Sequence, residues 1–189
     1  MIKLKKINFK SSAGFTLIEL LIVIAILGTL AVVVLIALNP LQQMARTRDS
    51  GRISTLSQLG HSMEAYATTH NGEYPTATGH TADWMTYYLQ DSGELSTVPK
   101  TLNYSVGTAS SCGGENGWCY TTYGDYALLY TTVEAASNIN KCDGDGEGCV
   151  NTKNSTGNAA YFVYSTEDGR AGLYCSATAP TGTIAFCEK

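Results

Sequence analysis

The stretch LLIVIAILGTLAVVVLIAL, residues 20–38, decides how this chain is organised. It contains 19 residues and no charge. As a helix it would be about 28 Å long at 1.5 Å per residue, close to the roughly 30 Å hydrocarbon core of a bilayer. A buried helix in a soluble core is the alternative, but the rest of the chain is too small to surround one. The stretch therefore predicts a helix that spans a membrane.

The residues before this stretch are basic and small. Four lysines and no acid precede it, which favours a cytoplasmic N-terminus, although three arginines follow the stretch and weaken the asymmetry. A secretory signal carries its small residues after a shorter apolar run, whereas here Ser11, Ser12, Ala13 and Gly14 come first. Cleavage ahead of the run would leave the apolar helix as the mature N-terminus. Ordinary secretion would instead require cleavage after the run.

Glu19 is an acid at the head of a segment suited to lipid. An ionised acid costs about 2.5 to 3.5 kcal/mol at the centre of a membrane helix and less near its end. Two interpretations follow. The carboxylate reaches the lipid headgroups, or it pairs with a cation that assembly brings into the membrane.

Residues 10–28, KSSAGFTLIELLIVIAILG, resemble the N-terminal signature of type IV pilins and type II secretion pseudopilins. The leader, glycine, aromatic residue, acid and apolar run follow the family's order. The resemblance implies that a prepilin peptidase cleaves between Gly14 and Phe15 and that the new α-amine of Phe15 is N-methylated. It also implies that Glu19 neutralises the Phe15 amine of a neighbouring subunit. Such a pair would favour assembly in the correct register, because charges attract strongly in a medium of low dielectric constant.

A second, amphipathic helix is expected over residues 40–71. Many members of the family have a proline at the position of Ile36, whereas this chain has Pro40. We expect the apolar side chains to pack on the protein's own sheet and Asn71-Gly72 to end the helix. The apolar positions are Met44, Ile53, Leu56, Leu59, Met63, Tyr66 and Ala67, and the expected polar face carries Arg46, Arg48, Asp49, Arg52, Gln58 and Glu64.

The remaining residues predict an antiparallel sheet. A short helix is expected at residues 83–89, followed by segments rich in aromatic and β-branched residues and separated by turn formers. The expected strands are 118–123, 126–133, 159–165, 172–176 and 183–186. The fold class is therefore α+β and, by the resemblance, type IV pilin-like. The regions are a leader (1–14), a membrane and filament-core helix (15–39), an amphipathic helix (40–71) and a connection with the sheet (72–189).

All six cysteines follow the apolar run, which indicates an oxidising location. Their spacing favours three sequential disulfides, although six cysteines allow 15 pairings. The expected pairs are Cys112 with Cys119, Cys142 with Cys149, and Cys175 with Cys187. The last pair resembles the disulfide that bounds the C-terminal region of many pilins. Zinc is disfavoured because no two-residue spacing with histidine support occurs.

One acidic loop is a candidate calcium site. Asp143, Asp145 and Glu147 alternate with glycines, and oxygen ligands at this spacing would suit Ca²⁺. Asn154 stands where an EF-hand loop would carry its last Glu, so a solvated acidic loop is the preferred interpretation. No cofactor is required.

Nothing in the sequence predicts an enzyme. The chain has no phosphate-binding loop and no nucleophile elbow, and His61, His70 and His80 form no metal-binding motif. The net charge is −4, and it becomes −8 when the four leader lysines are lost. Such a charge disfavours nucleic acid as a partner.

These features predict a structural subunit of a type IV pilus-like surface filament, a helical homo-oligomer. The subunit would sit in the inner membrane with its N-terminus in the cytoplasm before prepilin peptidase and the assembly machinery act on it. The first alternative is a major-type pseudopilin in a periplasmic pseudopilus of a type II secretion system. The second is a monomeric, membrane-tethered extracellular binding domain.

Overall fold

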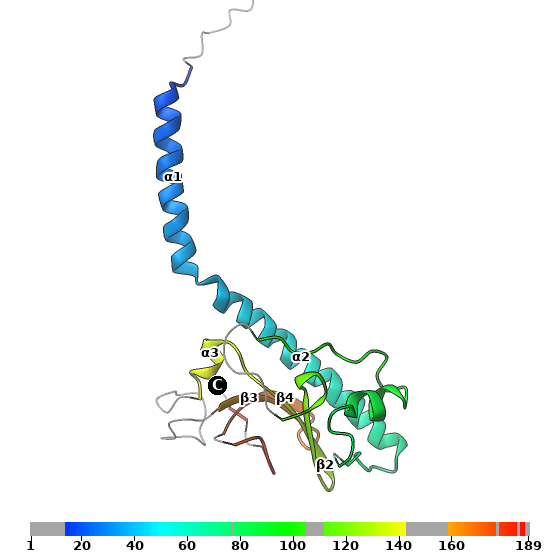
Figure 1. Ribbon diagram of the computed structural model, residues 1–189. Coiled ribbons are helices and arrows are strands. Elements are labelled where there is room, and N and C mark those ends of the chain that lie inside the picture. Colours follow the sequence, from blue (N-terminus) through cyan, green and yellow to red (C-terminus); the bar gives the residue numbers. More distant parts are fainter. Residues whose placement is uncertain are drawn as a thin grey trace, which may run out of the picture. The chain divides into compact units, whose positions relative to one another are not determined.

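A computed structural model of the chain describes residues 14–76, 78–104, 112–142, 159–176, 178–184 and 186–187. The chain divides into two compact units, Met1–Pro40 and Leu41–Lys189. The first unit contains helix α1 (Leu17–Leu38), and α2 (Pro40–Thr69) belongs to the second except for its first residue. Figure 1 shows these elements along the chain.

Helix α1 consists of 22 residues, none of which is buried. It is long and apolar enough to cross a membrane by length and composition. Thr16 caps its N-terminus, and Asn39 ends it in the left-handed conformation at φ 40°. Pro40 is the first residue of α2, where its missing N–H costs nothing and its fixed φ suits the helix. The residue before a proline avoids the helical conformation, which explains why the break falls at Asn39.

The described part of the second unit contains four strands in one antiparallel sheet. They are β1 (Cys119–Tyr123), β2 (Tyr126–Thr132), β3 (Ala159–Ser165) and β4 (Arg170–Ser176), in the order β1-β2-β3-β4. Each strand pairs with the next along the chain, so the sheet is a simple meander. The α+β class and the antiparallel sheet are therefore confirmed.

The fifth predicted strand, 183–186, is wrong. Its described residues lie outside any strand, although Cys187 N–H donates to Leu173 O at 2.8 Å. Gly182 adopts a positive φ of 69°, which turns the chain just before this segment. A single backbone bond after such a turn does not make a ladder.

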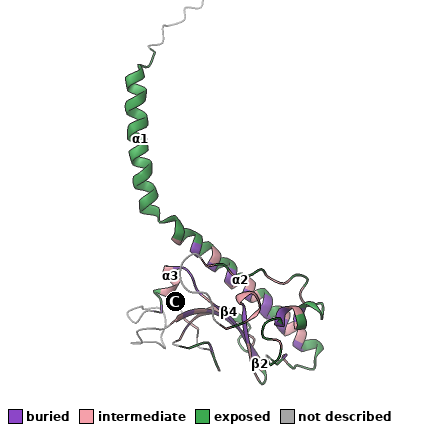
Figure 2. Cartoon of the chain, in the orientation of Figure 1, coloured by how far each residue is buried: buried purple, intermediate pink, exposed green. Residues whose placement is uncertain are grey.

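One face of the sheet packs on α2. Leu56, Leu59 and Met63 are fully buried against residues of the sheet, including Leu129 and Tyr164. Figure 2 shows the buried residues along α2. The prediction that α2 packs on its own sheet is confirmed, except at Met44, which is 56% exposed and therefore wrong as a packing residue. A second cluster of buried residues contains Cys119, Leu128, Tyr130, Val163 and Ile184.

Three short helices in the part of the chain that the structure describes connect these elements. They are the π-helix η1 (Met85–Gln90), the 3-10 helix η2 (Glu115–Gly117) and α3 (Ala136–Ile139). Trp84, just before η1, is fully buried, and its indole donates to Trp118 O at 3.0 Å. The helix expected at 83–89 thus takes a different, wider form over nearly the same residues.

Two disulfides are present in the described residues, and they correct the predicted connectivity. Cys112 pairs with Cys119 as predicted. Cys142 pairs with Cys175 instead of Cys149, so the pairs Cys142–Cys149 and Cys175–Cys187 are both wrong. The sheet brings Cys175 of β4 close to Cys142, which follows α3. The spacing of the cysteines along the chain could not predict this contact. Cys149 lies outside the described residues, and Cys187 Sγ lies 3.4 Å from Cys175 Sγ.

Candidate functional site

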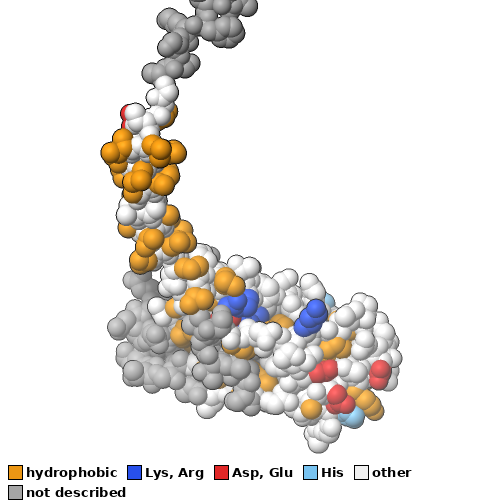
Figure 3. Space-filling model, turned by 45° about the horizontal axis from the view of Figure 1, so that its top comes forward, with side chains coloured by type: hydrophobic (Ala, Val, Ile, Leu, Met, Phe, Trp, Pro, Cys, Tyr) orange, Lys and Arg blue, Asp and Glu red, His pale blue; other side chains and the backbone are white. Residues whose placement is uncertain are grey.

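The first candidate site is the start of α1. Its side chains are almost entirely apolar and exposed, as Figure 3 shows. Phe15 is 86% exposed. Gly14 and Phe15 precede the helix without regular structure, so the predicted cleavage bond lies outside the helix. A peptidase needs an accessible backbone, and this position supplies one.

Glu19 and Thr16 form a capping box at the start of α1. Glu19 Oε2 accepts from both Thr16 N–H and Thr16 Oγ1–H at 2.8 Å, while Glu19 N–H donates to Thr16 Oγ1 at 3.3 Å. These bonds satisfy N–H groups that lack partners within the helix. They also hold the Glu19 carboxylate against Thr16, the residue that follows Phe15. The carboxylate therefore lies at the positive end of the helix dipole.

A carboxylate with this placement has further acceptor capacity. Its two oxygens offer about four acceptor positions, and the capping box occupies part of them. The group can therefore bind an ammonium as well. Cleavage at Gly14, methylation of Phe15 and pairing through Glu19 all stay predictions, and the structure places the three residues together at one end of α1.

A second candidate site lies in the body, where sequence reasoning missed it. Asp49 and Arg52 were expected on the polar face of α2, and this is wrong, because they are 1% and 3% exposed. Glu134, which follows β2, is fully buried beside them. These residues, with the partly exposed Arg48, form a buried ion-pair cluster. Its formal charges sum to zero.

Asp49 connects α2 to the segment that begins α3. Its Oδ1 accepts from Glu134 N–H at 3.0 Å, and its Oδ2 accepts from Ala135 N–H and Asn138 Nδ2–H at 2.9 Å. Arg52 Nη1 donates to Asp49 Oδ1 at 2.7 Å. Both oxygens of Asp49 are thereby satisfied away from water, as a buried carboxylate requires.

The Glu134 carboxylate accepts hydrogen bonds from both Arg48 and Arg52. Arg52 Nη2 donates to it at 2.8 Å, and Arg48 approaches through Nε at 2.9 Å and Nη2 at 2.6 Å. The hydrogen bond with Glu134 raises the pKa of Arg48. Arg52 also lies 4.1 Å from the centre of the Tyr104 ring. The cluster thus fixes the first half of α2 against the sheet by directional contacts.

A signal for this cluster exists in the sequence. Ala45, Asp49, Arg52 and Leu56 follow one another at spacings of four, three and four residues, and this line continues the buried stripe of α2. Two charged residues on a buried stripe indicate an internal ion pair. Glu134, far along the chain, carries no such pattern and could not have been found.

The structure does not test the predicted calcium site. Asp143, Asp145 and Glu147 lie outside the described residues, so calcium binding there stays a prediction. Within the residues that are described, no group of three or more His, Cys, Asp or Glu side chains could hold a metal ion. His61 Nδ1 lies 3.2 Å from the Tyr164 hydroxyl, which donates to Glu64 at 2.8 Å.

Comparison with known families finds a match over the segment that contains the first site. The prokaryotic N-terminal methylation motif matches residues 9–35. The match supports a class III prepilin signal, the kind of signal that type IV pilins and pseudopilins carry. The prepilin signal implies processing by a prepilin peptidase and use of a pilus-type assembly machinery, and it points to a structural subunit. No curated protein and no solved structure matches the chain.

Proposed function

We propose that this prepilin becomes a structural subunit of a type IV pilus-like surface filament, assembled through α1 after removal of the leader. The observation that carries the proposal is the methylation motif at residues 9–35, joined to an apolar helix of 22 residues. The subunit first sits in the inner membrane with its N-terminus in the cytoplasm. Neighbouring copies then replace lipid as the surroundings of α1.

The surface of α1 supports the proposal that lipid surrounds this helix first and neighbouring subunits surround it afterwards. Its apolar side chains cover every side, and Leu17, Leu27 and Leu35 are 85%, 58% and 62% exposed. An apolar surface of this extent needs a bilayer or other copies of itself to cover it. A bilayer alone would satisfy a tethered monomer, and Glu19 favours assembly because lipid alone offers this acid no cationic partner.

The body is suited to the outside of a filament. It carries disulfides, which form in oxidising compartments and stabilise small exposed domains. The net charge after cleavage is negative, and a net charge far from zero keeps a protein soluble. These properties also fit a periplasmic pseudopilus, so the place of assembly has to be measured.

The first experiment determines the N-terminus and the intact mass of material sheared from cells, compared with the membrane fraction. N-methylated Phe15 in sheared filaments is the expected result. Methylated Phe15 confined to membranes would indicate a pseudopilin. An intact Met1, or a start beyond Leu38, would contradict the proposal.

The second experiment tests Glu19 by substitution. Glu19→Ala should still be cleaved and should accumulate in the membrane at its mature mass, with no sheared filaments, because the Phe15 amine loses its partner. Asp83→Ala is the matched control, because it removes a carboxylate from a side chain of the body that is 56% exposed. Normal filaments from Glu19→Ala would exclude the proposed pairing.

A further inference from the structure

The loop closed by the Cys112–Cys119 disulfide holds two other segments of the body. This disulfide loop, residues 112–119, contains η2 and ends at the first residue of β1. Two side chains in the middle of the loop, Glu115 and Asn116, contact parts of the chain that precede it. The loop therefore connects the sheet to those earlier parts.

Glu115 fixes the start of η1. Its Oε2 accepts from Met85 N–H at 2.6 Å and from Thr86 N–H at 3.0 Å. Its Oε1 accepts from the Thr86 hydroxyl at 2.5 Å. The first N–H groups of a helix have no partner within the helix, so this carboxylate supplies the acceptors that η1 lacks.

Asn116 holds the segment 99–102. Its Nδ2–H donates to Pro99 O at 2.9 Å, and its Oδ1 accepts from the Thr101 hydroxyl at 3.0 Å. Its backbone O accepts from Leu102 N–H at 2.9 Å. Three hydrogen bonds to one residue thus fix this segment beside the disulfide loop.

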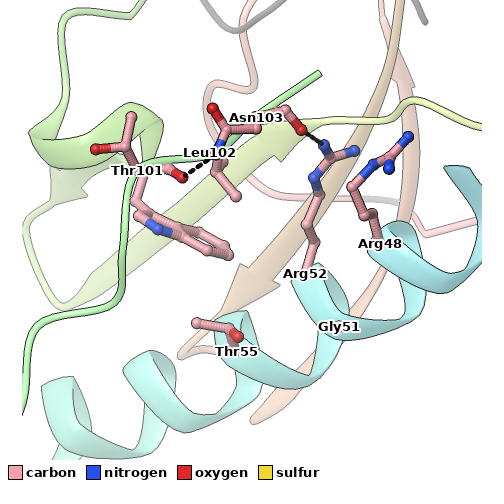
Figure 4. A pocket seen from close by; sticks show the side chains of 8 residues that line it. Arg48, Gly51, Arg52, Thr55, Thr101, Leu102 and Asn103 are labelled. Carbon is pink, nitrogen blue, oxygen red and sulfur yellow. Dashed lines mark hydrogen bonds between the residues drawn. The ribbon is translucent and has the colours of Figure 1, made fainter. Parts of the chain in front are cut away.

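The two segments held in this way cover part of the core. Met85 and Leu89 of η1 are fully buried in the cluster that includes residues of α2. Figure 4 shows residues 101–103 beside α2, where Arg52 Nη2 donates to Asn103 O at 2.9 Å. If both segments moved away, apolar side chains would meet water while the four strands kept their pairing.

The conformation of the disulfide loop is costly for its backbone. Gly113, Asn116 and Gly117 have positive φ angles of 68°, 55° and 86°. Position 114 requires glycine, because a Cβ at Gly114 would overlap Trp118 O. Glycine loses more conformational freedom on folding than any other residue. A disulfide offsets such a loss, because it restricts the unfolded loop.

We propose that the Cys112–Cys119 disulfide is a redox-sensitive latch that controls η1 and the segment 99–102. While the disulfide is intact, Glu115 and Asn116 stay where they hold both segments. When it is reduced, the loop regains its freedom and the two segments open, although the sheet stays folded. A chain whose two cysteines are still thiols has the open form.

A dithiol is the reductant that this latch requires. Its thiolate attacks Cys112, which is half-buried, rather than Cys119, which is 1% exposed. The bond between the two cysteine sulfurs breaks, and Cys119 leaves as a thiolate that takes up a proton. The second thiol of the reductant then displaces Cys112 from the mixed disulfide. Two electrons and two protons have passed to the protein, and the dithiol has become a disulfide.

Hydrogen–deuterium exchange of the full chain in detergent micelles tests the latch. Cys112→Ala combined with Cys119→Ala removes this disulfide alone. The amides of η1 should lose their protection in the double variant, whereas those of β3 should keep it. Protected η1 amides in the double variant would overturn the proposal.

Gly60→Ala separates opening of the latch from a general loss of stability. A Cβ at Gly60 overlaps the ring of Tyr164, and neither residue belongs to the disulfide loop. This variant should be less stable than the parent chain, with its η1 amides still protected. Loss of protection at η1 in Gly60→Ala would mean that η1 opens whenever the body is weakened, and it would overturn the proposal.

Tryptophan fluorescence tests the dependence on redox state. Trp84 precedes η1 and is fully buried, so opening should shift the emission to longer wavelength. Dithiothreitol should produce this shift in the parent chain, and reoxidation should reverse it. The double variant should show the shifted emission before any reductant is added. Unshifted emission from the double variant would assign the effect of dithiothreitol to another disulfide and would overturn the proposal. Both experiments use dispersed subunits, so they stand even if no filament forms.

Discussion

Gly60 and Gly51 lie on the same helix, yet a methyl group should have opposite effects at the two positions. A Cβ at Gly60 overlaps the ring of Tyr164, whereas one at Gly51 meets nothing within 4 Å. Gly60→Ala should lower the free energy of unfolding by about 1 to 3 kcal/mol through overpacking. Gly51→Ala should raise it by about 0.5 to 1 kcal/mol, because alanine favours the helix.

Urea unfolding of the full chain, followed by near-ultraviolet circular dichroism, measures both changes. The two glycines control for each other, since each receives the same methyl group in the same helix. Shifts of the same sign would show that the contact between Gly60 and Tyr164 does not govern the packing of α2 on β3.

At the scale of elements, the buried ion-pair cluster connects α2 to Glu134, which follows the end of β2. Asp49→Asn keeps the shape of the side chain but removes its charge beside Arg52. Breaking one partner of a buried pair costs about 3 to 5 kcal/mol, and we expect a loss in that range. Asp83→Asn is the matched control, because the Asp83 side chain is 56% exposed.

Unfolding midpoints in urea compare these variants. The control should stay within about 0.5 kcal/mol of the parent protein, as exposed pairs contribute little. An Asp49→Asn protein as stable as the control would show that the cluster adds no net stability.

The two disulfides close loops of different length. The separation is 33 residues for Cys142–Cys175 and 7 for Cys112–Cys119. Loop-closure entropy then predicts a loss of about 4 kcal/mol when the first is removed and about 2 kcal/mol for the second. Both cysteines of a pair are changed to alanine, because Cys187 Sγ lies 3.4 Å from Cys175 Sγ. Equal losses in thermal unfolding would contradict this order.

The sequence predicts features that depend on residues close together along the chain, and it does not predict contacts between residues that are far apart. The apolar run 20–38 and the aromatic and β-branched residues of β2 and β3 are local patterns, so α1 and the sheet could be predicted from them. Glu134, Trp118 and Cys175 act through partners far along the chain, and no local pattern reports such contacts. The ion-pair cluster and the second disulfide therefore emerged only from the fold.

At the scale of the whole molecule, burial of tyrosines ties stability to alkaline pH. Burial raises the pKa of Tyr120, Tyr130, Tyr161 and Tyr164 above the ordinary value of 10.0, and it also raises the pKa of the half-buried Tyr66. In the unfolded chain these hydroxyls lose their protons near pH 10. The folded state then holds more protons than the unfolded state, so the free energy of unfolding falls as pH rises.

The body should accordingly keep constant tyrosine-linked stability below about pH 9 and lose it above about pH 10, where unfolded tyrosines ionise. Urea midpoints between pH 8 and 11, with absorbance at 295 nm to follow tyrosinate, measure this.

Tyr161→Phe should make the alkaline decline shallower, since burial is the cause of its raised pKa and phenylalanine cannot ionise. Tyr87→Phe is the matched control, because Tyr87 is 49% exposed. An identical slope in Tyr161→Phe and the parent protein would mean that alkaline unfolding begins elsewhere.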